Sequence, residues 1–260
     1  MASARALCPP LLLLLAAAGA ALAKLPLPPY VRPCSFKLSD RKLSECALKS
    51  ARDIWPNILK GDPKYKVPVL DPMHLDRLVV IDGKGPLGMQ LIARDVKMYG
   101  LPDAIINSTT HRSNPQDNTY VATIPLVHIT AKYNVSGRIL LLPIVGQGNV
   151  VMDLKNVKLV YQFDFRLEKL EDGETYYIPL PGARLDLDVD GMTIKMDNLF
   201  NGDGALLDTT NNFLNEEWRE VFDSLRPSFA KAISEVITDI LNGIFRQVPF
   251  KDAFLDVDAV

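Results

Sequence analysis

A period of two governs the apolar positions in the middle of the chain, from Leu78 to about Met196. Apolar residues recur at every second position from Val157 to Phe165 and again from Leu185 to Val189. After Gly191 the alternation resumes one residue out of phase, from Met192 to Met196. This pattern predicts long antiparallel strands with one buried and one hydrated face. The phase slip predicts a bulge or bend at Gly191 that lets the sheet curl.

Two strand-like stretches have no clear polar face. Apolar residues occupy both phases from Tyr120 to Ile129, and 139–145 is apolar almost throughout. Strands of this kind are typical of sheets that are covered on both sides. Part of the sheet is therefore expected to lie between two apolar layers.

Helical periodicity appears at both ends of the chain. A first helix is predicted from Leu43 to Leu59 and is expected to be interrupted at Pro56. Near the C-terminus, 211–247 repeats apolar residues every three or four positions, which predicts a helix about 50 Å long, kinked or divided at Pro227. Its apolar stripe is too wide for a coiled coil, so its partner must be the sheet.

The first 23 residues have the pattern of a secretory leader. Arg5 precedes an apolar run from Leu11 to Ala18, which ends in the small-residue triplet 21–23. This block is shorter than the ~20 residues of a membrane-spanning helix, so an uncleaved anchor is disfavoured. Cleavage would leave Lys24 first, and we expect the mature protein to be secreted and extracellular.

Export determines how the cysteines are interpreted. Cys8 belongs to the leader, so Cys34 and Cys46 remain and are expected to pair in an oxidising compartment, contributing ~3 kcal/mol. Two free buried thiols are the alternative, and the ligand set for a zinc site is lacking. The sequons at Asn107 and Asn134 predict glycosylation, the first in a loop and the second on a strand where it would have to face water.

Size and charge narrow the possible partners. The 260 residues carry a formal charge of −2, which becomes −3 when Arg5 leaves with the leader. Basic and acidic residues are interleaved, which argues against nucleic acid or an anionic membrane as a partner. No low-complexity linker divides 24–260, so a single domain is expected.

Catalytic motifs are mostly excluded. The sequence has no G-x-S-x-G, H-E-x-x-H or P-loop pattern, and no cofactor is expected. The glycines of 83–88 fit G-x-G-x-x-G, but alternation resumes after them, so they predict a turn between antiparallel strands. Of the three histidines, His74 follows a Pro-rich connector, His111 lies in a polar stretch, and His128 shares the expected inward phase of its strand.

The expected fold class is α+β: a long C-terminal helix wrapped by a strongly curved antiparallel sheet. The inward faces supply more large apolar side chains than one helical stripe needs, so either an ordinary filled core or an internal apolar tunnel is possible. Inward phase selects the candidate tunnel lining. These residues are Met89, Leu91, Tyr120, Ile124, Leu126, His128, Tyr133, Tyr161, Phe163, Phe165, Met192, Met196, Phe213, Trp218 and Phe222.

Three sequence blocks carry a family resemblance. They are 27–34 with Cys46, 137–148 with its Gly146-Gln147-Gly148 ending, and 197–203 leading into 213–218. With these blocks in this order, the mature chain resembles the takeout and juvenile-hormone-binding family of secreted insect proteins, within the tubular lipid-binding superfamily. The resemblance implies a helix wrapped by a curled sheet around an apolar tunnel, and it favours the tunnel over the filled core.

The resemblance also implies a function. Family members, some of them related to circadian biology, carry terpenoid hormones or other long apolar molecules through haemolymph or sensory lymph without catalysis. This mature chain lacks the cysteines for the second disulfide of the hormone-binding members, so it resembles the takeout-like branch. We expect a monomeric carrier of a long apolar molecule. The alternatives are a regulatory protein acting through protein contact and a lipid ester hydrolase with a nucleophile beside His128.

Overall fold

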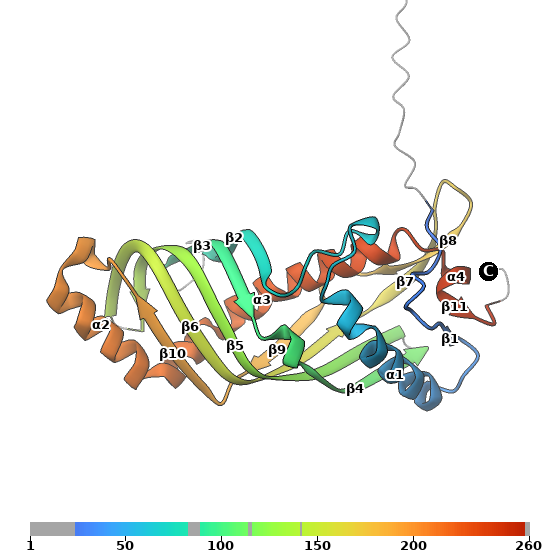
Figure 1. The fold of residues 1–260 in the computed structure, drawn as a ribbon, viewed down its shortest axis with the longest axis horizontal. Coiled ribbons are helices and arrows are strands. Elements are labelled where there is room, and N and C mark those ends of the chain that lie inside the picture. The colour runs from blue at the N-terminus through green and yellow to red at the C-terminus, as the bar shows by residue number, and fades with distance from the viewer. Residues whose placement is uncertain (1–23, 83–88, 114–115, 141, 258–260) are drawn as a thin grey trace, which may run out of the picture.

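The computed structural model describes residues 24–82, 89–113, 116–140 and 142–257, so the predicted leader and the predicted turn at 83–88 lie outside the described residues. Figure 1 shows the helices and strands, coloured in chain order. Their bounds are β1 Cys34–Ser35, α1 Asp40–Ile58, η1 Pro63–Tyr65, β2 Met73–Asp82, β3 Gln90–Tyr99, η2 Leu101–Asp103, β4 Ile105–Ser113, β5 Gln116–Ile139, β6 Leu142–Phe163, β7 Phe165–Lys169, β8 Thr175–Pro179, β9 Arg184–Asp188, β10 Gly191–Met196, η3 Phe200–Gly202, α2 Gly204–Glu216, α3 Trp218–Phe245, α4 Phe250–Ala253 and β11 Phe254–Leu255.

One long antiparallel hairpin, formed by β5 and β6, is the centre of the sheet. Along the outer edge of β5, β3 pairs with its second half and β4 with its first half. On the outer edge of β6, β10 pairs with residues 150–155 and β9 pairs with residues 158–162. The hairpin therefore joins two half-sheets: β2, β3 and β10 flank one end of it, and β4 and β9 flank the other.

The hairpin changes its buried face where the two half-sheets meet. Ile124 and Val127 are both buried on β5, and their partners Val157 and Leu154 are both buried on β6. Inward-facing residues of a regular strand are two positions apart, but these two buried residues are three apart on each strand. Beyond this point, the residues that would have faced outward therefore face inward. Asn156 on β6 adopts a positive φ of 48° at the same place. The single inward phase that the sequence predicted across this region is therefore wrong.

Two predicted lining residues are corrected by this change of face. Leu126 is 47% exposed and lies on the outer surface. His128 follows it on the same outer face, where its Nδ1 lies 2.7 Å from Oδ1 of Asp153 on β6. The aromatic ring of Tyr99 on β3 lies against the imidazole. The sequence did predict the equivalent slip near Gly191, where buried Val189 and Met192 stand three residues apart.

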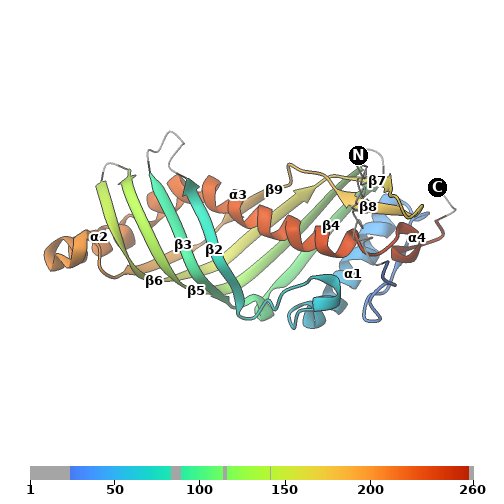
Figure 2. The same cartoon turned by 90° about the horizontal axis from the view of Figure 1, so that it is seen from above.

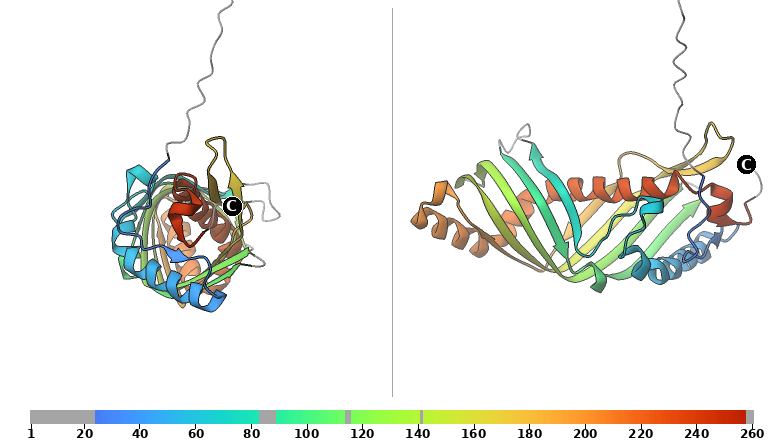
Figure 3. Two further views of the ribbon diagram at one scale, coloured as in Figure 1. Left: turned by 90° about the vertical axis from the view of Figure 1, so that its right-hand side faces the viewer. Right: turned by 45° about the horizontal axis from the view of Figure 1, so that its top comes forward.

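The helix α3 lies along the concave side of the sheet, which curls around it when seen down the long axis (Figures 2 and 3). It contacts β8, β9, β10 and β2. A division at Pro227 is wrong, because α3 continues through Pro227 and the division from α2 falls at Glu217. Pro227 is exposed, so water can reach the backbone carbonyl that loses its N–H partner there.

The helix α2 begins at Gly204, earlier than the periodicity indicated, and covers the free edge of β10. Asn215 donates to the Ile194 carbonyl through Nδ2 (2.7 Å) and accepts from the Ile194 N–H through Oδ1 (2.9 Å). Asn211 makes the same pair of bonds with Met196, both at 2.9 Å. Two amides one helical turn apart therefore take the place of a neighbouring strand.

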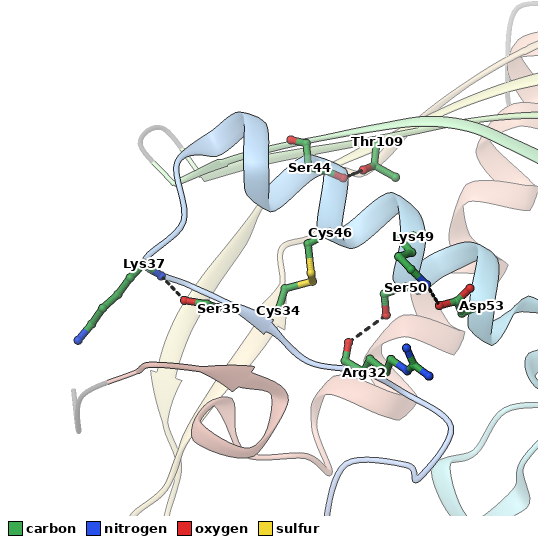
Figure 4. The surroundings of a disulfide bond; sticks show 10 residues. All are labelled: Arg32, Cys34, Ser35, Lys37, Ser44, Cys46, Lys49, Ser50, Asp53 and Thr109. Atoms are coloured by element: carbon green, nitrogen blue, oxygen red, sulfur yellow. Dashed lines mark hydrogen bonds and ion pairs between the residues drawn. A yellow bond between two sulfur atoms is a disulfide. The ribbon is translucent and has the colours of Figure 1, made fainter.

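The helix α1 packs against β4 at the other end of the molecule. Thr109 Oγ1 donates to the Ser44 carbonyl at 2.8 Å, and the Trp55 indole donates to the Leu101 carbonyl at 3.1 Å. The predicted interruption at Pro56 is wrong, since the helix continues to Ile58. The predicted Cys34–Cys46 disulfide is confirmed, with an S–S distance of 2.00 Å, and fixes the N-terminal arm to this helix (Figure 4).

The chain termini assemble into a cap at the same end. β1 pairs in parallel with β11, and the rings of Phe36, Phe250 and Phe254 lie within 5.3 Å of one another, centre to centre. Glu174 Oε1 accepts hydrogen bonds from Lys24 and Lys251, each at 2.7 Å. The N-terminal arm, the β7–β8 turn and α4 are thereby joined through one carboxylate.

Because Glu174 holds the cap together as an ionised carboxylate, we expect acid to destabilise the cap. Hydrogen bonds from Lys24 and then Lys251 hold the pKa of Glu174 below its ordinary value of 4.5. A depressed folded-state pKa gives stability that is present above the unfolded value and is lost as pH falls through the folded one. We expect the melting temperature to fall less between pH 5 and pH 3 in Glu174→Gln than in the native chain. Equal slopes in a thermal-unfolding series would contradict this role.

Other sequence expectations are revised by the strands. Asn107 is exposed but lies at a bulge within β4, where a loop was expected. Asn134 lies on β5 with exposed Lys132 and Ser136, on the outer face. The apolar stretch 139–145 is the tip of the β5–β6 hairpin, with Leu140 and Val145 exposed, so it is not covered on both sides.

Among the described residues, no helix combines the length and the apolar character that crossing a bilayer requires.

Candidate functional site

The candidate site is the interior between α3 and the half-sheet formed by β4, the first half of β5, the second half of β6, and β9. The two halves of α3 meet this interior differently. In the first half, taken as the part before Pro227, Val221, Phe222 and Leu225 are buried and Trp218 is partly buried. In the second half only the small residues 230, 232 and 234 are buried, and every large apolar side chain keeps accessible surface. These partly exposed side chains are Phe229, Ile233, Val236, Ile237, Ile240, Leu241, Ile244 and Phe245.

Aromatic rings line the sheet side of this interior. Phe165 and Tyr177 stack with centroids 3.8 Å apart, and Tyr177 meets Phe245 of α3 at 4.8 Å. Tyr161 and Phe163 follow along β6, with centroids 5.5 Å apart. Rings in offset or edge contact give a rigid apolar wall. This wall faces the half of α3 that is only partly packed.

Polar groups are few here and occupy defined positions. The Tyr161 hydroxyl lies 2.9 Å from Thr238 Oγ1 on α3, so a hydrogen bond crosses the interior. Asn118 on β5 is 1% exposed, and its Nδ2 donates to the Phe163 carbonyl at 3.4 Å. Its Oδ1 is hydrogen bonded to Nδ1 of His111 on β4. The buried amide is thus held by neighbours on both sides.

Tyr120 on β5 is a partly buried side chain next to the aromatic wall. Its ring stacks near Phe163 with centroids 6.3 Å apart and meets His111 edge-on at 5.4 Å. Loss of hydration raises the pKa of Tyr120 to about 12, which is the effect of a deep site. The side chain nevertheless keeps accessible surface. Tyr120 therefore stands at the margin of the aromatic wall, where its phenol is largely removed from water.

The structure places the predicted lining residues in three groups. Fully buried are Met89, Ile124, Tyr133, Tyr161, Phe163, Phe165, Met192, Met196 and Phe222. Partly buried and packed against the core are Leu91, Tyr120, Phe213 and Trp218. On the outer face are Leu126 and His128, which are the two corrections.

The inward-facing residues belong to one continuous hydrophobic core, but they lie on both sides of the bend in the hairpin. Met89, Tyr133 and Met196 lie in the half-sheet next to α2, while Tyr120 and Phe163 lie in the half next to α1. Sequence reasoning missed Asn118, Tyr177 and Thr238. The short run Tyr176-Tyr177-Ile178 of strand-forming residues could have indicated Tyr177, whereas no local signal distinguished the asparagine or the threonine.

A surface groove of about 810 Å³ runs between α3 and the segment before β9. Ser234 and Thr238 of α3 lie on one side, and Ala183 and Leu185 lie on the other. Ser234 Oγ donates to the Ala183 carbonyl at 3.0 Å across it. Because Thr238 also contacts Tyr161, the groove reaches the edge of the aromatic interior.

Together these features define an α+β protein in which a long helix is enclosed by a curved, open antiparallel sheet with an apolar, aromatic interior. The family model described as haemolymph juvenile hormone binding protein matches residues 11–255. The chain therefore belongs to the juvenile hormone binding protein family.

Individual relatives agree with this assignment. The circadian clock-controlled protein daywake of Drosophila melanogaster is 25% identical over 229 residues, which cover 85% of this chain and 88% of the relative. Daywake of Drosophila yakuba is 24% identical over the same length and shares of both chains. The crystal structure of Epiphyas postvittana Takeout 1 superposes with a TM-score of 0.73 at 25% identity, covering 86% of this chain and all of the other. The fold is thus that of takeout proteins, and the family is one of lipophilic-ligand binders.

Proposed function

We propose that this protein is a secreted carrier that encloses a long apolar molecule, such as a terpenoid or a fatty-acyl compound, between α3 and the sheet. The observation that carries the proposal is the contrast along α3: Val221, Phe222 and Leu225 are buried before Pro227, whereas every large apolar side chain after it is incompletely buried. Large apolar side chains that contact the core without being fully covered are suited to an apolar guest. The family assignment supports the same function.

Export is part of the proposal. The leader pattern in residues 1–23 and a disulfide between Cys34 and Cys46, the kind of bond that persists in oxidising compartments, both support it. The family description names haemolymph as the location of its members. Sequons at Asn107 and Asn134 on the outer face are compatible with passage through the secretory route.

The energetics allow useful affinity without catalysis. Each buried CH₂ contributes about 0.8 kcal/mol, so a chain of about fifteen carbons gains roughly 12 kcal/mol in gross terms. Association costs at least ~4 kcal/mol, which leaves at most about 8 kcal/mol, the free energy of micromolar binding. Sequestration of one molecule in the interior therefore requires no covalent step.

The test is recovery of the ligand from protein secreted by insect cells and purified without detergent. Organic extraction followed by mass spectrometry is expected to yield an apolar compound in near-stoichiometric amount. An unrelated secreted protein prepared in the same way supplies the blank. A clean extract, together with no binding of the apolar dye N-phenyl-1-naphthylamine, would refute the carrier function and favour action through protein contact.

The hydrolase alternative loses the residue on which it depended. It required a nucleophile beside His128 in the apolar interior, but His128 lies on the outer face between Tyr99 and Asp153. Turnover of terpenoid or fatty-acyl esters that disappears in His128→Ala would still restore this alternative.

A further inference from the structure

The outer face of the half-sheet next to α2 carries a row of cationic side chains. Arg77 on β2 pairs in register with Arg94 on β3, and Arg94 pairs with Lys132 on β5. All three residues are exposed, and Lys132 stands between buried Ala131 and Tyr133, so the row faces away from the interior. Residues directly opposite on neighbouring strands have their Cβ atoms about 5 Å apart. Three like charges therefore lie in one line across three strands.

A second row lies beside the first, on the side toward the bend in the hairpin. His74 on β2 pairs with exposed Lys97 on β3. The same row continues through Thr130 and Val151 to exposed Lys195 on β10. The two rows form a basic face, which consists of His74, Arg77, Arg94, Lys97, Lys132 and Lys195. Because the sheet curls around α3, this face is convex (Figure 3).

The carboxylates of the fold do not neutralise this basic face. Asp95 on β3 lies within it, with Oδ1 3.0 Å from His74 Nε2 and Oδ2 3.7 Å from Lys132 Nζ. The contact with His74 is the main reason that the pKa of Asp95 is below its ordinary value. Arg77 and Arg94 form no ion pair with any residue that the structure describes. The first row thus keeps two uncompensated guanidinium groups side by side.

This arrangement opposes folding and is not visible in the sequence. Like charges directly opposite each other destabilise a sheet. The chain as a whole has a formal charge of −2, and Arg77 directly follows Asp76, so no basic run marks the site. Strand pairing gathers cationic residues that are interleaved with acidic ones along the chain. A repulsion that the fold itself does not relieve is relieved when an anion binds there.

The geometry of the basic face selects the kind of anion. The second row reaches from β2 to β10, so a single small anion would cover only a fraction of it. A flat bilayer would touch only part of a convex face. Protein partners are usually anchored by apolar side chains at the centre of the contact, and the two rows contain only one, Val151. A flexible chain with repeated sulfate groups can follow both rows, and a guanidinium group binds such oxyanions through two hydrogen bonds.

We propose that the basic face binds a linear sulfated polysaccharide, which lies across the strands on the outside of the sheet. The site is separated from the apolar interior by the sheet itself, so the protein can hold an apolar molecule and a polysaccharide at the same time. Such binding would retain the secreted protein on sulfated surfaces outside the cell. The proposal goes beyond the carrier function and does not rest on it.

The test is calorimetric titration of the secreted protein with heparin at neutral pH and low salt. The protein is first treated with an endoglycosidase, because the Asn134 sequon lies on the same outer face. The variant Arg77→Gln/Arg94→Gln/Lys132→Gln is expected to bind heparin at least about tenfold more weakly, the combined effect of three exposed charge contacts. Binding by the native chain should weaken as sodium chloride is added, because salt screens exposed charges.

The matched control removes three positive charges from the other end of the molecule. It is Arg41→Gln/Lys42→Gln/Lys49→Gln, and all three positions are exposed on α1. Its affinity for heparin should stay within about twofold of the native value, because these charges lie far from the basic face relative to the screening length. Both triple variants should bind N-phenyl-1-naphthylamine as the native chain does, which reports separately on the fold and on the apolar interior.

Each outcome decides the proposal. Equal weakening in the two triple variants would show an effect of net charge alone and overturn the basic face as a site. Failure of the native chain to bind heparin would overturn it too, while dye binding would leave the carrier function in place. Tighter binding of polyglutamate or of phosphatidylserine vesicles than of heparin would overturn the polysaccharide as partner. Should the triple variant not fold, Arg94→Gln alone removes the central charge of the row and is expected to weaken heparin binding by about threefold.

Discussion

Gly100→Ala is expected to lower the free energy of unfolding by about 3 kcal/mol, measured by urea denaturation. Gly100 joins β3 to η2 at the point where the two half-sheets meet. Its φ is +100°, and a Cβ built there would lie 2.1 Å from the backbone carbonyl oxygen of Leu126. A backbone atom cannot rotate away as a side chain can, so η2 would have to lift from β5 at the bend.

Gly182→Ala is the matched control, because Gly182 has the same φ of +100° but nothing within 4 Å of its would-be Cβ. It reports the cost of the backbone conformation alone, about 1–2 kcal/mol. The excess cost at Gly100 then measures the close approach to Leu126. Equal losses in the two variants would show that the contact at the bend contributes nothing to stability.

Leu225→Ala is expected to cost about 3 kcal/mol, and Leu241→Ala only about 1 kcal/mol, in the ligand-free protein. Both leucines lie on α3, but Leu225 is 7% exposed in the packed half and Leu241 keeps more accessible surface in the other half. Truncating a close-packed side chain leaves a cavity, whereas truncating one beside an open space removes fewer contacts.

The same pair of variants should respond differently to ligand. Adding dodecan-1-ol should raise the melting temperature of Leu225→Ala by as much as that of the native chain, because its binding surface is intact. The increase should be smaller for Leu241→Ala, which loses contact with the bound chain. Equal destabilisation of the two ligand-free variants would indicate a uniformly filled core and contradict the internal space.

The bend in the hairpin shows where local pattern stops being informative. Around Gly191 a glycine and a clean alternation on both sides made the phase slip readable in the sequence. Around Pro125 both faces of β5 carry apolar residues, so the shift from buried Ile124 to buried Val127 leaves no mark in the pattern. Leu126 and His128 were therefore assigned to the wrong face.

The helix boundaries, too, could be predicted only in part from the sequence. Proline chemistry predicted a kink or division at Pro227, but α3 continues through it, because the contacts of α3 with the sheet outweigh the local cost of the proline. The break occurs at Glu217, where α2 turns to cover β10 through Asn211 and Asn215. Polar helix residues of this kind carry no periodic signal, and their partners are known only once the sheet is placed.

The sequence by itself determined the α+β class, the long C-terminal helix, the paired cysteines and most residues that face inward, because periodicity, composition and export chemistry are local properties of the chain. Only the tertiary structure decided how the half-sheets join, which face each strand presents beyond the bend, and that Asn118, Tyr120 and Tyr177 meet inside. Those outcomes depend on contacts between segments far apart in the chain, such as β6 with α3. Hydrogen-bond partners and accessible interior surface exist only after these segments have come together.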